Sequence, residues 1–126
     1  MTEIQAFFII AGMSEILTHP DRTTSLLLLD LYGALLTERT KEVLEFYLAE
    51  DLSLAEIAEN LAISRQGVHD AVNRGMASLL DFENRLRFLE RRQKAEAELS
   101  LARKAVAAGD RQGAENSLQT LAELLW

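Results

Sequence analysis

Six polar side chains within residues 64–74 are the ones in this sequence best suited to binding chemistry. They are Ser64, Arg65, Gln66, His69, Asn73 and Arg74. Arginine can bind guanine or phosphate with two donors, asparagine and glutamine can pair with adenine, and all of them can hold backbone oxygens. Amide groups at an exposed helix start add donors for a phosphate. These residue types predict a nucleic-acid-binding surface, and the alternative is an ordinary solvated helix face, above all for His69.

Two helices joined by a tight turn are expected to position these side chains. The stretch from Ser53 to Leu61 opens with a capping box, in which Ser53 is followed three residues later by Glu56. A second helix begins at Ser64, after a turn at residues 62–63. The apolar residues expected to hold the two together are Ile57, Ala58, Leu61, Val68 and Val72. The pattern is typical of a helix-turn-helix, whose second helix reads the nucleic acid.

The remaining sequence predicts an all-α fold, a small helical bundle followed by a C-terminal helical hairpin. Leucine-rich helical spacing starts at Thr24, after the break at His19-Pro20-Asp21, and Thr37 is expected to cap a helix over 38–49. The expected buried face of that helix is Val43, Leu44, Phe46 and Tyr47. The helix from Ser64 is expected to be long, with a kink near Gly75.

The expected domain organisation has three parts. Residues 1–21 form an N-terminal extension or leader helix, 22–92 the helix-turn-helix domain and 93–126 the hairpin, with the joint at residues 91–94. Gly109 and Asp110 are expected to end one arm of the hairpin and cap the other. The apolar residues expected on the two arms are Leu99, Ala102, Val106, Leu118, Leu121 and Leu125.

Composition and charge exclude several classes of function. The chain of 126 residues has no cysteine, two histidines and a net charge of −7, which leaves no thiolate or histidine-rich metal site. It has no glycine-rich phosphate loop and no nucleophile elbow, so we expect no enzyme, no metal and no cofactor. Residues 38–61 carry a net charge of −5 and residues 64–92 carry +2, so any nucleic-acid contact must come from a local basic patch.

The apolar runs of the chain are too short for a membrane span. Residues 1–12 and 26–36 each fall well below the ~20 residues that a bilayer requires. The first run also lacks the positive flank of a secretory signal. We therefore expect a cytoplasmic protein without membrane insertion. Met13 offers a second start, so residues 1–12 are either a start-site extension or a short helix that covers the core.

Three segments carry a resemblance to known proteins. Leu36–Leu44, Leu52–Glu59 and Ile63–Val68 resemble region 4 of bacterial sigma factors. With Leu31–Thr37, Tyr47 and Arg65-Gln66, the chain is more similar still to the YlxM family of small helix-turn-helix proteins. The resemblance covers residues 22–92. It implies a bacterial cytoplasmic protein with a regulatory part in the signal recognition particle pathway, no enzymatic activity, and the six polar residues as the recognition face. That family commonly has Ala, Tyr and Lys at the positions of Gly67, His69 and Asn73.

Two functions and two quaternary states stay open from the sequence. The first function is a non-enzymatic regulator that binds DNA or the RNA of the signal recognition particle. The second is an interaction module that binds proteins of the particle through its acidic helices or an apolar stripe, without contacting DNA. The stripe consists of Leu79, Phe82, Leu86 and Leu89, and either the hairpin or the second chain of a homodimer must cover it.

Overall fold

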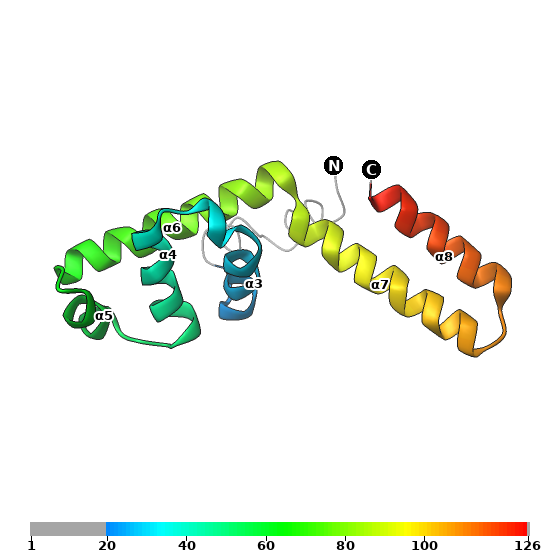
Figure 1. Ribbon diagram of the computed structural model, residues 1–126, viewed down its shortest axis with the longest axis horizontal. Coiled ribbons are helices and arrows are strands. Elements are labelled where there is room, and N and C mark those ends of the chain that lie inside the picture. Colours follow the sequence, from blue (N-terminus) through cyan, green and yellow to red (C-terminus); the bar gives the residue numbers. More distant parts are fainter. Residues whose placement is uncertain (1–19, 126) are drawn as a thin grey trace. The chain divides into compact units, whose positions relative to one another are not determined.

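The computed structural model describes residues 20–125, and these residues contain six α-helices and no strand, which confirms the all-α prediction (Figure 1). The helices are α3 (Arg22–Tyr32), α4 (Glu38–Leu44), α5 (Leu54–Leu61), α6 (Arg65–Leu86), α7 (Phe88–Ala107) and α8 (Arg111–Leu124). A 3-10 turn, η1 (Gly33–Leu35), follows α3, and a π-helical turn, η2 (Glu45–Ala49), follows α4. Of the expected leader, residues 1–21, positions 1–19 lie outside the described residues.

Side-chain caps fix the start of most helices. Thr37 Oγ1 accepts from the Thr40 amide, and Ser53 and Glu56 form the predicted capping box. Asp110 Oδ1 accepts from the Gly113 amide at 2.9 Å, so these three predicted caps are confirmed. α3 begins at Arg22 rather than Thr24, because Asp21 Oδ1 already accepts from the Thr24 amide at 2.7 Å.

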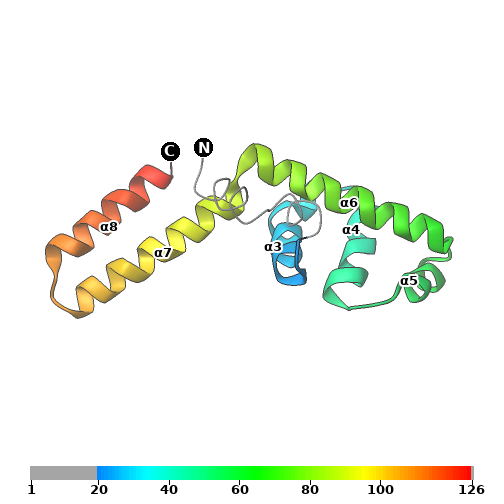
Figure 2. The same cartoon turned by 180° about the vertical axis from the view of Figure 1, so that it is seen from behind.

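The chain folds as two compact units that divide between Leu86 and Arg87. In the first unit, α3, α4 and α5 pack on α6, which both views of the fold show as the longest helix of this unit (Figure 2). The residues fully buried between these helices are Leu28, Tyr32, Val43, Leu44, Ile57, Val68 and Leu79. The ring of Phe82 lies 5.9 Å from that of Tyr32. Of the first half of the predicted apolar stripe, Leu79 is therefore buried inside this unit and Phe82 is half-buried.

The expectation of a straight α-helix over 38–49 with Tyr47 buried is wrong. The Glu50 amide donates to the carbonyl of Glu45, five residues earlier, so the end of the segment is a π-helical turn. This wider turn changes the phase of the side chains. Leu48 takes the core position, Phe46 is half-buried and Tyr47 is 38% exposed.

Gly75, near which a kink is expected, does not interrupt its helix, since α6 runs unbroken from Arg65 to Leu86. Gly75 is buried where α4 crosses α6. A Cβ added there would lie 2.7 Å from Leu44 Cδ1 and 2.9 Å from Thr40 Cγ2. The glycine is therefore used for the close approach of two helices rather than for bending one of them.

The joint expected at residues 91–94 is wrong, because those residues lie inside α7. The break falls at Arg87, whose backbone is left-handed with φ of 57°. No proline or glycine marks this position, so local sequence signals could not have placed the break there.

The second unit is the predicted helical hairpin of α7 and α8. Gly109 has φ of 72° and ends the turn, as expected. Small residues are buried on both helices, namely Ala102 of α7 and Ala114 and Ser117 of α8. Leu89 and Glu90 at the start of α7 are buried as well. Of the apolar residues expected on the inner faces, Ala102 is buried and Leu121 is half-buried, whereas Leu99, Val106, Leu118 and Leu125 are exposed.

Candidate nucleic-acid interface

The helix-turn-helix is built from α5 and α6. α5 ends at Leu61, and the left-handed backbone of the next residue, Ala62 (φ 55°, ψ 42°), redirects the chain toward α6. Its amide and that of Ile63 close the end of α5 by bonding to the carbonyls of Glu59 and Ala58. Ile57 and Val68, one from each helix, are fully buried. The start of α6 is therefore held by its inner face, which leaves the outer face to solvent.

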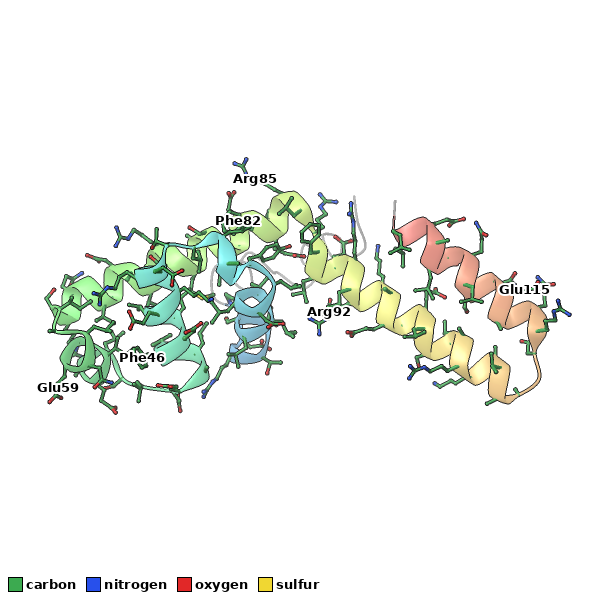
Figure 3. The ribbon with its side chains drawn as sticks, in the orientation of Figure 1. Phe46, Glu59, Phe82, Arg85, Arg92 and Glu115 are labelled. Atoms are coloured by element: carbon green, nitrogen blue, oxygen red, sulfur yellow. The ribbon has the colours of Figure 1, made fainter. Side chains whose placement is uncertain are left out.

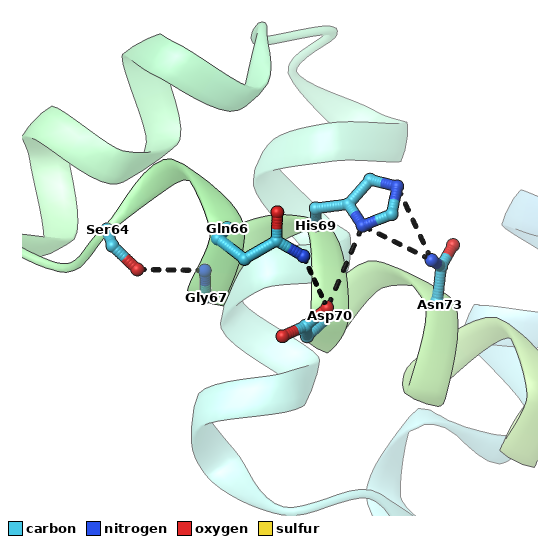
Figure 4. Close-up of polar contacts among 6 residues, drawn as sticks. All are labelled: Ser64, Gln66, Gly67, His69, Asp70 and Asn73. Atoms are coloured by element: carbon cyan, nitrogen blue, oxygen red, sulfur yellow. Dashed lines mark hydrogen bonds and ion pairs between the residues drawn. The ribbon is translucent and has the colours of Figure 1, made fainter.

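All six predicted site residues lie at this start of α6 and are exposed. Ser64 has a structural task as well, since its Oγ accepts from the Gly67 amide at 2.9 Å and caps the helix (Figure 4). Gly67 therefore contributes to the cap through its backbone amide. The sequence analysis thus placed the six residues on the correct element, and the structure brings them together over three turns of one helix.

Two i,i+4 contacts organise the outer face of α6. Gln66 Nε2 donates to Asp70 Oδ1 at 2.9 Å, and the side-chain nitrogen of Asn73 lies 3.4 Å from His69 Nδ1 (Figure 4). His69 Nδ1 also lies 3.8 Å from Asp70 Oδ1. Sequence reasoning missed Asp70, although its four-residue spacing from Gln66 is a usable signal. The Asp70 carboxylate at the centre of this face would repel a phosphate. It can accept a hydrogen bond from a donor such as the amino group of cytosine.

The two arginines of the face lie on opposite flanks of α6. Nine residues separate Arg65 from Arg74, and at 3.6 residues per turn this spacing rotates the second side chain by about 180° from the first. Gln66, Asp70 and Asn73 occupy the arc between them. Among the described residues, neither arginine forms an ion pair. Both guanidinium groups are therefore available to bind phosphates on either side of the central polar residues.

A third cation, Arg39, comes from a different helix but lines the same groove as Arg74. The two line one groove of about 470 Å³ between α4 and α6, whose apolar walls include Leu35, Leu36 and Phe82. Arg39 also forms no ion pair within residues 20–125. No spacing rule relates residue 39 to residue 74, so only the packing of α4 on α6 identifies this pair.

The arginines beyond the recognition segment are partly neutralised by acids. Arg85 pairs with Asp81 at 3.1 Å and Arg92 pairs with Glu96 at 3.1 Å. Figure 3 shows Arg85 near the end of α6 and Arg92 near the start of α7. These i,i+4 pairs indicate a solvated face on which bases alternate with acids.

Two other kinds of site are not found in the described part of the chain. None of its helices combines the length and the apolar character that crossing a bilayer demands. Its histidine, aspartate and glutamate side chains form no group of three that could hold a metal ion.

The comparisons with known proteins agree with this architecture. A family model described as "UPF0122: Putative helix-turn-helix protein, YlxM / p13 like" matches residues 20–119. A UPF0122 protein of Symbiobacterium thermophilum is 44% identical over 94 residues, covering 65% of this chain and 88% of that protein. One of Acetivibrio thermocellus is 52% identical over 73 residues, with coverage of 55% and 62%. One of Shouchella clausii is 41% identical over 91 residues, with coverage of 72% and 84%.

Proposed function

The chain belongs to the UPF0122 family of YlxM/p13-like proteins, and from this premise we propose that it is a non-enzymatic, cytoplasmic regulator that binds nucleic acid through α6. In this proposal α5 is the supporting helix and the first half of α6, from Arg65 to Met76, is the recognition helix. The observation that carries it is the exposed polar face of α6, flanked by two arginines without acidic partners among the described residues.

The charge of the chain sets the expected strength of binding. Residues 1–86 contain six basic and fourteen acidic residues, a net charge of −8. Long-range attraction to a polyanion is therefore unfavourable, and binding must depend on a few local contacts from Arg65, Arg74 and Arg39. A protein that neutralises only two or three phosphates binds weakly and loses affinity as salt rises.

Fluorescence anisotropy against labelled duplex DNA of mixed sequence, at 50 and 200 mM salt, tests the proposal. A second titration uses the RNA of the signal recognition particle, because the family resemblance implies a part in that pathway. Binding at 50 mM that falls at 200 mM would support the proposal. Arg65→Ala should raise the Kd several-fold and lower the salt slope by about 0.9, the value for one phosphate contact.

Arg103→Ala is the matched control, because Arg103 is an exposed arginine of α7 that likewise forms no ion pair among the described residues. It should leave the Kd within twofold of the wild type. No binding of either nucleic acid at 50 mM, or equal effects of the two substitutions, would contradict an interface on α6.

A second candidate function is favoured by the same charge distribution. We infer that the acidic first unit could instead bind a basic protein of the signal recognition particle, with Glu45 and Glu50 exposed at the end of α4 and η2. Mixing the chain with the GTPase of the particle in size-exclusion chromatography tests this. A complex that survives Arg65→Ala and is lost with Glu45→Lys/Glu50→Lys would favour the interaction module over the nucleic-acid binder.

A further inference from the structure

The hairpin of α7 and α8 exposes an apolar strip on each of its helices. Leu99 and Val106 of α7 are 42% and 70% exposed, and Leu118 and Leu125 of α8 are 56% and 74% exposed. These are large side chains, whereas the residues buried between the helices are small. The hairpin thus closes mainly through alanine and serine, with Leu121 and Leu124 half-buried, and leaves Leu99, Val106, Leu118 and Leu125 exposed to solvent.

The two strips lie on the same face of the hairpin. Val106 follows the buried Ala102 by four residues, and Leu118 follows the buried Ala114 by four residues. Four residues rotate a side chain by about 40° in the same sense around each helix axis. Because the two helices run in opposite directions, these rotations bring both side chains to one face of the pair. Leu101, one residue before Ala102, falls on the opposite face and is 53% exposed.

Both helices also carry the same spacing of charged and apolar residues. In α7 the order is Arg92, Glu96, Leu99, Val106, and in α8 it is Arg111, Glu115, Leu118, Leu125. The arginine and glutamate of each set form an i,i+4 ion pair, at 3.1 Å in α7 and 3.2 Å in α8. Figure 3 labels one member of each pair, Arg92 and Glu115. An apolar strip bounded by paired charges therefore occurs twice in an antiparallel hairpin.

We propose that this face binds the same face of a second copy, so that two hairpins form a four-helix bundle. A hairpin of about 40 residues is at the size where oligomerisation usually supplies the missing core. The seven-residue spacing of each strip is the one with which helices pack on one another.

Charge also favours a second copy as the occupant. Residues 87–126 contain seven basic and six acidic residues, so their net charge is +1, in contrast to −8 for residues 1–86. The edges of the face carry both positive and negative charges, and these are already paired within each helix as Arg92–Glu96 and Arg111–Glu115. A copy of the same surface meets no excess of like charge there, which is the condition that a self-complementary interface must satisfy.

Sedimentation equilibrium of the full chain over a range of concentrations tests the proposal. The wild type should reach twice the chain mass of 14.1 kDa. Leu99→Gln/Leu118→Gln should raise the dimer dissociation constant at least about 100-fold, because each substitution removes buried apolar surface from both copies. Leu101→Gln is the matched control, with similar exposure on the opposite face, and should leave the constant unchanged. Far-UV circular dichroism checks that all variants keep the helicity of the wild type.

Three outcomes would overturn the proposal. The first is a wild type that stays at the mass of one chain. The second is a dimer that the double substitution leaves intact, which would place the interface elsewhere. The third is an equal effect of Leu101→Gln and the double substitution. The nucleic-acid proposal can fail without any of these results, because Arg65, Arg74 and Arg39 lie in the other unit.

Discussion

The hydroxyl of Tyr32 donates a hydrogen bond of 2.6 Å to Glu83 Oε1, joining the last residue of α3 to α6 across 51 positions of sequence. Tyr32 is fully buried and its ring contacts Phe82 one position earlier on α6. The pair anchors the second half of the helix whose first half carries the proposed recognition face. The position of that face thus depends on a contact far from it in the chain.

Tyr32→Phe should lower the free energy of unfolding by about 1–2 kcal/mol, because it removes one hydrogen bond to a charged acceptor and keeps the ring. Urea denaturation followed by circular dichroism measures this change. Tyr47→Phe is the control, since the Tyr47 side chain is exposed, and it should change stability by less than about 0.5 kcal/mol. Equal losses from the two substitutions would show that the Tyr32 hydroxyl contributes nothing specific.

Gly75→Ala should destabilise the fold by about 1–2 kcal/mol, although alanine is the better helix former by about 1 kcal/mol. The added methyl would meet side-chain atoms of Leu44 and Thr40 of α4 at less than 3 Å. Because Leu44 is fully buried, its side chain or the helix that carries it would have to shift. Thermal or urea unfolding shows whether Gly75→Ala raises or lowers the free energy of unfolding. Ala77→Gly, at an exposed site of the same helix, measures the propensity effect alone. A stabilised Gly75→Ala variant would show that α4 and α6 do not approach each other so closely.

The N-cap of α3 should make stability depend on pH in the acid range. The Thr24 backbone amide, followed by its side-chain hydroxyl, donates to Asp21 and holds the pKa of this carboxyl below its ordinary value of 3.8. A depressed folded-state pKa means that the stabilisation is present above pH 3.8 and is lost as pH falls through the lower, folded value. The advantage of the wild type over Asp21→Ala in urea unfolding should therefore shrink below about pH 3.8. An advantage that grows with acid would refute the cap.

Asp70→Asn should strengthen nucleic-acid binding if α6 is the interface. It removes the carboxylate at the centre of the face, while the new carboxamide oxygen can still accept from Gln66. Anisotropy at 50 mM salt should show a Kd about two- to fivefold lower, with a smaller effect at 200 mM. Glu123→Gln removes one negative charge from an exposed position of α8 and should have no such effect. Equal gains from both variants would mean that only the total charge matters.

Much of this protein could be predicted from local sequence signals. The caps at Thr37, Ser53, Ser64 and Asp110, the left-handed Gly109 and the order of helices each depend on residues within four positions of one another. The helix-turn-helix and the exposure of all six predicted site residues follow from the same short-range rules.

Only the tertiary structure decided the features that join distant segments. Tyr47 left the core because a π-helical turn changed the phase of its helix, and the break at Arg87 has no local marker. Gly75 serves the crossing of α4 and α6, and the same packing places Arg39 and Arg74 in one groove. Caps and helical periodicity are settled by interactions between near neighbours, so a sequence displays them. Helix phase, close approach and neighbouring cations depend on how whole helices pack, and that is settled only when the chain has folded.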